Sequence, residues 1–246
     1  MELTLIHLYP EQMNIYGDLG NVAALKFRCQ QRGISLTVRN IRPADRLTPG
    51  SFDLVFGGGG QDNQQVIVSR ALQNQKSVLK AAAAQGIPML TICGTYQLFG
   101  RCFKPFAGPV LPGIGIFPAS TLASLKRKIG NILIKTDWGE LVGFENHSGN
   151  TYLENKHQAF GRVIAGFGNN GRDHTEGCRI NNIFGCYLHG SLLPKNPVLA
   201  DHLITTALEI KYQTKIKLQP LDDRLEWRAH DEAVKIANKK SGWRNR

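Results

Sequence analysis

The sequence lacks the features that would place the chain in a membrane or outside the cell. No apolar run approaches the roughly 18 residues of a membrane span, and the N-terminus does not have the basic-then-apolar layout of a signal peptide. Cysteine is scarce: the five residues among 246 are odd in number and have no framework spacing, which argues against a disulfide scaffold. We therefore expect a globular protein of the cytoplasm.

Motifs for nucleotides and metals are also missing. No Gly-x-x-x-x-Gly-Lys run followed by Ser or Thr occurs, so we expect no ATP site of the P-loop type. Cys178, Cys186 and His189 lie close in sequence, but there is no Cys-x-x-Cys and no second pair of ligands, which disfavours a zinc site. The prediction is a chain with no metal or cofactor of its own.

The sequence contains few acidic residues relative to basic ones. The chain has 30 Lys and Arg against 19 Asp and Glu, a formal charge of +11. This balance favours an anionic partner such as nucleic acid, a phosphate-bearing substrate or an acidic membrane surface. However, the basic residues are spread along the chain, with a dense run at Lys126-Arg127-Lys128, and no nucleic-acid recognition motif is present. We expect no nucleic-acid partner.

The first hundred residues alternate between apolar strand patterns and helical periodicity. The expected strands are 2–9, 34–41, 52–56 and 88–92, with one helix ending before Gly33 and another over 64–85. This alternation predicts an α/β fold with a mostly parallel sheet and helices on both faces. In such folds the functional site lies at the carboxyl ends of the strands.

After residue 103 the pattern changes to short strands and turns. We expect strands at 130–136, 140–144 and 182–188, followed by closing helices at 197–212 and 222–237. No internal repeat or low-complexity linker divides the chain. The simplest prediction is a single domain over 1–246, with a C-terminal helical segment at about 197–240.

An abrupt change of pattern singles out Cys93. The apolar run 88–92 ends there, and Gly94 begins a helical pattern. A cysteine at a helix N-terminus gains thiolate character from the unpaired N–H groups and the helix dipole. The arrangement is that of a hydrolase nucleophile elbow, although Thr91 and Thr95 stand where its glycines usually lie. A buried structural cysteine is the alternative.

Two further features fall at strand ends. Four consecutive glycines, Gly57 to Gly60, follow the third strand and would bring bare N–H groups next to an oxyanion; a flexible tight turn is the alternative. Among seven histidines, His189 stands out because it ends an apolar strand directly before a glycine, although a structural histidine would fit there too. A nucleophile, a base and N–H donors together are what acyl transfer needs.

Six runs spread over nearly the whole chain carry a resemblance to a known family. They are 16–21 (YGDLGN), 57–62 (GGGGQD), 90–97 (LTICGTYQ), 143–147 (GFENH), 166–170 (GFGNN) and 187–196 (YLHGSLLPKN). In combination they resemble the class I glutamine amidotransferases of the cobyric-acid-synthase type. Within that family the resemblance is closer to the glutaminase subunits of lipid II isoglutaminyl synthases. It implies the flavodoxin-like fold of class I glutamine amidotransferases.

The resemblance also implies roles for particular residues. Cys93 would attack the side-chain amide of glutamine and His189 would move the proton, giving ammonia and a glutamyl thioester that water releases as glutamate. Backbone N–H groups of Gly58, Gly59 and Gly94 would hold the oxyanion, and losing one such donor typically costs about 10²–10³ in rate.

The resemblance also bears on positions around the expected nucleophile and base. Gln97 would belong to the glutamine pocket. Arg127 matches an arginine implicated in glutamine binding, and its guanidinium suits the α-carboxylate; a solvated basic loop is the alternative. Many relatives have a Glu two residues after the histidine, but this chain has Ser191 there, so the resemblance is to the Cys–His dyad branch. Thr95 stands where these relatives usually carry glycine, and we expect it to crowd the elbow.

The resemblance further implies a second subunit. Ammonia is useful only beside an activated acyl group, so a Mur-ligase-like partner, MurT, would bind ATP and amidate the D-glutamate α-carboxyl of lipid II in peptidoglycan synthesis. The positive charge would help such a heterodimer sit peripherally at the inner face of an anionic membrane. Two alternatives remain: an amidotransferase for another carboxylate such as a corrinoid, and a non-catalytic binding module.

Overall fold

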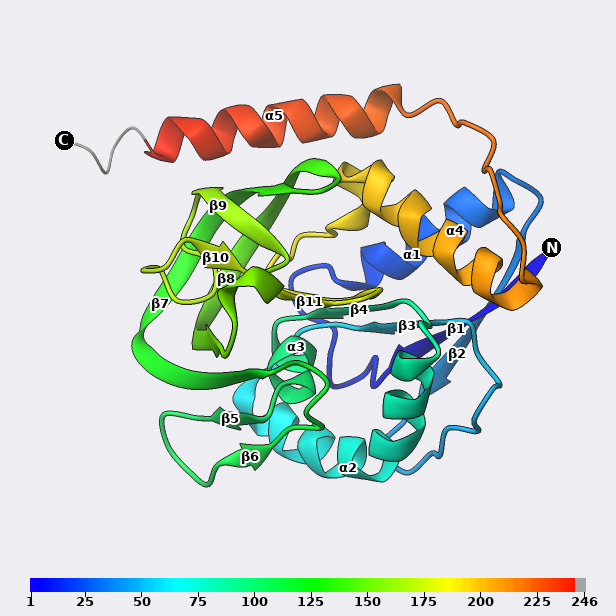
Figure 1. Cartoon of the computed structure of the whole chain (residues 1–246). Helices are drawn as coiled ribbons and strands as arrows, with labels where there is room; N and C mark the ends of the chain where they lie inside the picture. The colour runs from blue at the N-terminus through cyan, green and yellow to red at the C-terminus, as the bar shows by residue number, and fades with distance from the viewer. Residues whose placement is uncertain (242–246) are drawn as a thin grey trace.

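A six-stranded sheet forms the centre of the computed structural model, which describes residues 1–241. Its strand order is β11-β12-β4-β3-β1-β2, and every neighbouring pair is parallel except β11 and β12 (Figure 1). The strands are β1 (Glu2–Leu8), β2 (Ser35–Ile41), β3 (Leu54–Gly57), β4 (Met89–Ile92), β11 (Cys178–Ile180) and β12 (Ile183–Cys186).

Helices cover both faces of this sheet. Helices α1 (Leu19–Gln30) and α4 (Pro197–Tyr212) lie on one face, and α2 (Asp62–Ala84) and α3 (Gly94–Phe99) lie on the other (Figure 1). All residues of β3, β4 and β12 are buried, because strands of a parallel sheet covered on both faces meet no water. The predicted fold class, a mostly parallel sheet between two helical layers, is confirmed.

A second sheet was not predicted. Its order is β10-β9-β7-β5-β6, with β8 paired to β7. Its strands are β5 (Cys102–Lys104), β6 (Leu111–Pro112), β7 (Ala119–Thr136), β8 (Gly139–Leu153), β9 (Gly161–Ala165) and β10 (Thr175–Glu176). A short 3₁₀ turn, η1 (Lys156–Gln158), joins β8 to β9, and a second, η2 (Leu193–Lys195), follows β12.

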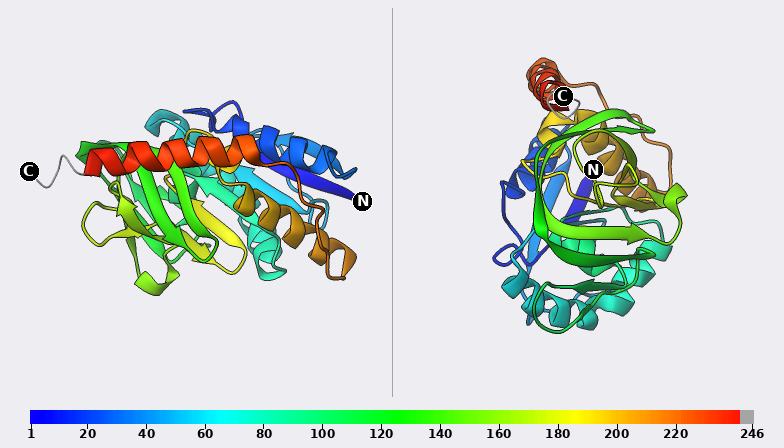
Figure 2. Two further views of the ribbon diagram at one scale, coloured as in Figure 1. Left: turned by 90° about the horizontal axis from the view of Figure 1, so that it is seen from above. Right: turned by 90° about the vertical axis from the view of Figure 1, so that its left-hand side faces the viewer.

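Strands β7 and β8 form a long, curved antiparallel hairpin (Figure 2). The short strands expected at 130–136 and 140–144 are only its far end, so their predicted lengths are wrong. The register shifts between Ala123 and Lys128, where the mostly polar run 124–128, in which Leu125 is exposed, interrupts the apolar alternation that marks a strand. This irregular part of the hairpin is the part nearest the carboxyl ends of the central strands.

Helix α5 (Arg224–Ser241) lies along the outside of the hairpin (Figures 1 and 2). It contributes Ala233, Val234 and Ala237 to a small apolar cluster with the second sheet. Among the described residues, no helix combines the length and the apolar character needed to cross a membrane.

Hydrogen bonds connect the segment before α5 to α1. The Arg28 guanidinium donates hydrogen bonds to Asp201 on α4, at 2.7 and 2.8 Å, and to Asp223, at 2.5 and 3.0 Å. Arg28 is 2% exposed, so its guanidinium is buried, whereas the two carboxylates are half-buried.

Candidate active site

Cys93 sits in the turn between β4 and α3. Its backbone has φ 50° and ψ −103°, a left-handed conformation that non-glycine residues rarely adopt. Its N–H donates to the carbonyl of Cys186 on β12, at 2.8 Å, and the residue is 6% exposed. Strained backbone of this kind is concentrated at functional sites, and here it turns the thiol-bearing residue sharply out of the strand.

His189 reaches the same edge of the sheet from β12. Strands β12 and β4 are parallel neighbours in which Cys186 lies opposite Ile92, so the residues after each strand leave the sheet side by side. A pair of backbone hydrogen bonds with Phe144 on β8, at 2.9 and 3.0 Å, then fixes the backbone of His189. The structure therefore brings together two residues that are 96 positions apart, 189 against 93.

Asp18 is the third member of the site, and the sequence interpretation did not name it. Its carboxylate accepts a hydrogen bond from Nδ1 of His189, at 3.0 and 3.1 Å to its two oxygens, and both side chains are fully buried. Oδ2 also accepts from the N–H of Gly59, at 2.7 Å. Asp18 lies in the 16–21 run, which contributes to the family resemblance, but no spacing rule links position 18 to position 189.

Charge around the imidazole decides its protonation. Burial opposes the charged form of His189, but the interactions with Cys93 and Asp18 outweigh it and raise its pKa to about 10. These interactions favour the protonated, imidazolium form of His189. Because the Nδ1–H of His189 donates to Asp18, the proton on Nε2 is the one that can be transferred to a reacting group.

Ser191 occupies the position where many relatives carry the orienting Glu. Its hydroxyl donates instead to the carbonyl of Gly17, at 2.6 Å, and a Cβ on Gly20 would lie only 2.1 Å from its oxygen. Ser191 thus holds the loop that carries Asp18, and Asp18 reaches the imidazole from that loop. The orienting acid comes from another part of the sequence.

The glycine run packs directly against these residues. A Cβ on Gly59 would lie 2.5 Å from Cε1 of His189, so the close approach requires glycine. The N–H of Gly59 already donates to Asp18, which does not fit the expectation that Gly59 holds an oxyanion. Gly60, in contrast, lines the cavity beside Cys93, and its nitrogen is 3.0 Å from the position of a Cβ on Gly94.

We expected Thr95 to crowd the elbow, but its side chain does not enter the cavity. Its hydroxyl donates to the carbonyl of Gly58, at 2.7 Å, and its methyl group packs against Gly57, where a Cβ would lie 2.5 Å away. Thr95 is fully buried and does not line the cavity. The threonine side chain therefore fixes the glycine loop to the elbow.

A cavity of about 340 Å³ opens at Cys93. It lies between the glycine run and the β7–β8 hairpin and is lined by Ile15, Tyr16, Gly60, Gln61, Asp62, Cys93, Gln97, Phe103, Arg127, Ile129, Asn146, His147 and Ser148. Its size suits a small metabolite such as an amino acid.

Two predicted pocket residues line this cavity. Arg127 donates to the side-chain oxygen of Asn146, at 2.6 and 3.1 Å, and contacts the Tyr16 hydroxyl at 3.4 Å. Gln97 is 5% exposed; it accepts from Gln65, at 2.6 Å, and donates to the Tyr187 hydroxyl, at 3.1 Å. Arg127 is an exposed residue that lines the cavity, whereas the amide of Gln97 is held in its wall by these hydrogen bonds.

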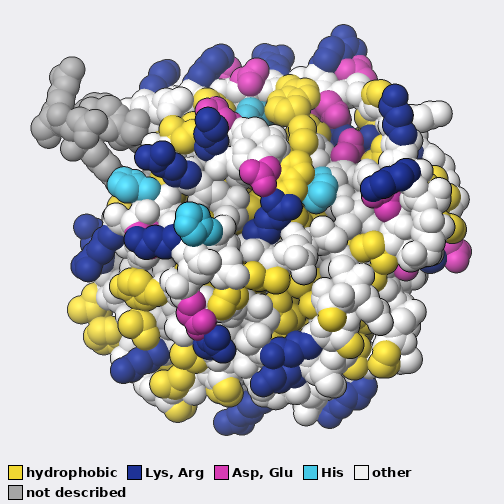
Figure 3. Space-filling view, in the orientation of Figure 1, with side chains coloured by type: hydrophobic (Ala, Val, Ile, Leu, Met, Phe, Trp, Pro, Cys, Tyr) yellow, Lys and Arg dark blue, Asp and Glu magenta, His cyan; other side chains and the backbone are white. Residues whose placement is uncertain are grey.

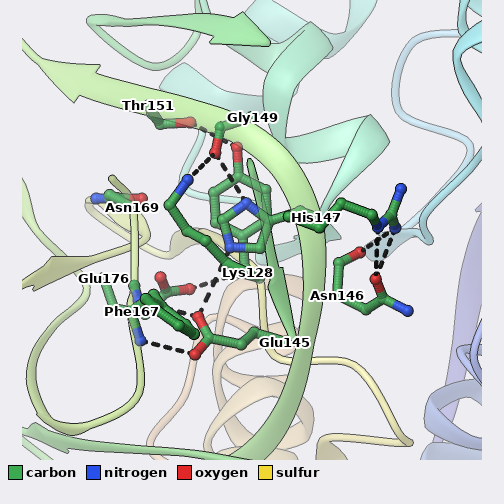
Figure 4. Close-up of polar contacts among 12 residues, drawn as sticks. Lys128, Glu145, Asn146, His147, Gly149, Thr151, Phe167, Asn169 and Glu176 are labelled. Carbon is green, nitrogen blue, oxygen red and sulfur yellow. Dashed lines mark hydrogen bonds and ion pairs between the residues drawn. The ribbon is translucent and has the colours of Figure 1, made fainter. Parts of the chain in front are cut away.

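A buried polar layer lies behind the cavity, inside the hairpin (Figure 4). The His147 ring stacks on Tyr187, with ring centres 3.6 Å apart, and its Nδ1 donates to the carbonyl of Gly149, at 2.9 Å. Burial lowers the pKa of His147, so its imidazole is neutral. The same Gly149 carbonyl accepts from Lys128, at 3.2 Å. The layer thus connects the cavity wall to the opposite face of the hairpin.

This fold and site define a class of protein. Solved glutamine amidotransferases share the fold. One from Thermotoga maritima aligns with a TM-score of 0.53 at 14% identity, covering 95% of this chain and 94% of that one. The CTPS glutaminase domain of Trypanosoma brucei aligns with a TM-score of 0.56 at 11% identity, covering 89% of this chain and 96% of that one.

Residues 4–197 match the CobB/CobQ-like glutamine amidotransferase domain, and the chain belongs to that family. It is similar over its full length to GatD, the glutamine-hydrolysing subunit of lipid II isoglutaminyl synthase. Identity is 38% with the Staphylococcus aureus protein (97% of each chain) and 35% with the Streptococcus pneumoniae protein (97% of this chain, 93% of that one). The resemblance drawn from the sequence runs is confirmed, and the chain is a glutamine amidotransferase.

Proposed function

We propose that this chain is the glutamine-hydrolysing subunit of a lipid II isoglutaminyl synthase. The single observation that carries the proposal is the juxtaposition of Cys93, which lines an amino-acid-sized cavity, with the buried side chains of His189 and Asp18. Two relatives of that name align with nearly the whole chain. A corrinoid acceptor has weaker support, since a cobyric acid synthase from Pelotomaculum thermopropionicum is 27% identical and only 39% of it is covered.

In the proposed reaction, Sγ of Cys93 attacks the side-chain amide carbon of glutamine. The carbonyl oxygen becomes an oxyanion that accepts hydrogen bonds from backbone N–H groups, for which Gly60 and Gly94 are the best placed. When the C–N bond breaks, Nε2 of His189 gives its proton to the departing amine, which leaves as ammonia. Gly58 remains a further candidate donor from the same loop.

The thioester is then hydrolysed. His189, now neutral, takes a proton from a water molecule as the water attacks the thioester carbon. The C–S bond breaks, glutamate leaves, and the thiolate–imidazolium pair is restored. Asp18 acts on Nδ1 throughout, so that Nε2 always faces the reacting atoms; it is a positioning residue.

Arg127 would hold the substrate. Its guanidinium lines the cavity and is fixed by Asn146, a geometry that suits a bidentate contact with the α-carboxylate of glutamine. Gln97 would shape the wall near the side-chain amide.

The ammonia would pass to a Mur-ligase-like partner of the MurT kind, which supplies the ATP site and amidates the D-glutamate α-carboxyl of lipid II. Under this proposal the chain is a single glutaminase domain with no cofactor of its own, working as half of a heterodimer at the inner face of the membrane.

Ammonia release from glutamine tests the proposal. It is measured for the full chain and for Cys93→Ala, each alone and with the partner, ATP and lipid II. We expect turnover by the wild type and loss of turnover in Cys93→Ala, with amidated lipid II formed only when both subunits are present. No ammonia from the wild type under any of these conditions would overturn the proposal in favour of a binding module.

A further inference from the structure

A second cavity lies on the hairpin and shares no lining residue with the catalytic cavity. Its volume is about 280 Å³, and it is bounded by β7, β8 and the turn that follows Gly166. Side chains along β7 divide between the two cavities: Lys126 and Lys128 line this one, and Arg127 and Ile129 line the catalytic one. This division follows from the strand, in which successive side chains point to opposite faces.

The second cavity is surrounded by positive charge. Lys126 and Lys128 from β7 and Arg172 from the turn line it, and no carboxylate does. Lys126 and Arg172 form no ion pair within the part of the chain that the structure describes. On the face shown in Figure 3, by comparison, Lys and Arg are scattered over many elements. Around this hollow, two cations without an ion pair, Lys126 and Arg172, meet the buried ammonium of Lys128.

Lys128 gives this cavity a fixed, buried donor. The side chain is 5% exposed, and its ammonium donates to the carbonyl of Gly149, at 3.2 Å (Figure 4). It also donates to the side-chain oxygen of Asn150, at 2.5 Å. An ammonium has three N–H groups, so one remains for a ligand. Burial lowers the pKa of Lys128, and although Glu145 raises it, Lys126 and Arg172 lower it again, so each of these two cations lies close enough to repel the Lys128 ammonium. A bound anion would relieve that repulsion.

We propose that this cavity is a binding site for a phosphate-type oxyanion, held by Lys128 with Lys126 and Arg172 closing over it. Two ammonium groups and a guanidinium match an ion that carries more than one negative charge, and a guanidinium forms paired hydrogen bonds with phosphate oxygens. The volume is at the small end of ligand sites, which run from about 300 to 1,000 Å³. It suits a phosphate or diphosphate group, free or as part of a larger ester.

The site is joined to the catalytic cavity by one carbonyl group. Gly149 accepts hydrogen bonds from both Lys128 and His147, and His147 lines the catalytic cavity. An anion that draws the Lys128 ammonium toward itself weakens its bond to Gly149 and changes the support of the His147 ring. Occupation of the second cavity therefore alters glutamine binding; this last step rests on the proposed function, whereas anion binding does not.

Binding is tested with the full chain by calorimetric titration and thermal denaturation, using inorganic phosphate, pyrophosphate and glycerol phosphate against chloride at matched ionic strength. The test variant is Lys126→Ala/Arg172→Ala, which leaves buried Lys128 in place. The matched control is Lys135→Ala/Arg162→Ala, which removes the same charge from exposed positions of the same sheet. We expect saturable binding in the wild type and the control, and at least about a tenfold weaker affinity in the test variant, about 1.4 kcal/mol.

The outcomes separate the possible sources of the ligand. Tight binding of free phosphate or pyrophosphate assigns an inorganic anion, and preference for glycerol phosphate assigns a phosphate ester. No binding to the wild type, or equal loss in both double variants, overturns the proposal. The coupling is read separately as a change of at least about twofold in KM for glutamine at saturating anion, present in the wild type and absent in the test variant. A chain that binds the anion but hydrolyses no glutamine would count against the proposed function alone.

Discussion

At the scale of single residues, the site depends on what surrounds His189. Cys93 and His189 were found from the sequence because each ends an apolar strand next to a glycine, and parallel strands end at a common edge. Asp18 was not found, because it reaches His189 through a loop whose course depends on tertiary packing, including the contact of Ser191 with Gly17. Thr95 was misjudged for the same reason: its direction is set by the glycine loop.

Asp18→Asn should remove the anchor of the imidazole without changing its volume. Nδ1 loses its anionic partner, so the ring is held less firmly and its proton is less available on Nε2. We expect kcat for glutamine hydrolysis to fall by about 10²–10⁴, the usual range for acid–base catalysis, with a much smaller change in KM. Asp62→Asn is the control, since Asp62 lines the same cavity, at a strongly exposed position. Equal losses in both variants would contradict the assignment.

The protonation of His189 gives a second prediction. Its pKa is raised to about 10 in the folded chain, above the ordinary value near 6.5, so the folded state binds the extra proton between these values. The stabilisation is complete below about pH 6.5 and is lost as pH rises through 10. Cys93→Ala removes one of the groups that raise the pKa, so the imidazole should titrate at lower pH. NMR titration of the His189 ring measures this, and coincident curves for the two proteins would refute it.

At the scale of elements, the β7–β8 hairpin forms one wall of the cavity at Cys93. Its far end was predicted because 130–136 and 140–144 are apolar, but its near end was missed because a polar run with a register shift has no strand signature. That near end supplies Arg127, Asn146 and His147 to the cavity. The cavity wall and the buried polar layer both require polar side chains. The same side chains break the apolar alternation by which a strand is recognised in the sequence.

Helix α5 supports this hairpin from outside, and its contact can be tested. Ala237 is 2% exposed in the cluster with Leu133, Val142 and Ala165. Ala237→Asp places an unpaired carboxylate there, and we expect the free energy of unfolding to fall by about 1–3 kcal/mol, the cost of burying an unsatisfied polar group. Ala229→Asp, at an exposed position of the same helix, should change it by less than about 0.5 kcal/mol. Chemical denaturation of both variants provides the comparison.

At the scale of the whole molecule, distant parts of the chain are joined by buried charge. Arg28 on α1 holds Asp201 on α4 and Asp223 before α5, and these hydrogen bonds raise the pKa of Arg28 although burial lowers it. Sequence patterns revealed the helices but not this connection, because a pairing across 173 or 195 positions leaves no local trace.

Arg28→Ala should therefore destabilise the chain well beyond the loss of one side chain. It leaves two carboxylates partly buried without their shared cation, and breaking a buried pair in this way typically costs about 3–5 kcal/mol. Because Asp201 also accepts from Arg32, at 2.7 Å, we expect the lower part of that range, measured as the change in free energy of unfolding. A decrease of less than about 1 kcal/mol in the free energy of unfolding would show that the cluster of Arg28, Asp201 and Asp223 does not stabilise the fold.

The strand order has a consequence for the order in which the chain is made. Strand β12, which delivers His189, inserts between β4 and β11 and is the last strand of the central sheet in the sequence. A ribosome-bound chain that has emerged only as far as β10 contains Asp18 and Cys93 but has no proton donor and an unfinished sheet edge beside the nucleophile. The site is therefore complete only after β12 has been synthesised and has paired with β4, which makes its assembly one of the last steps of folding of the central sheet.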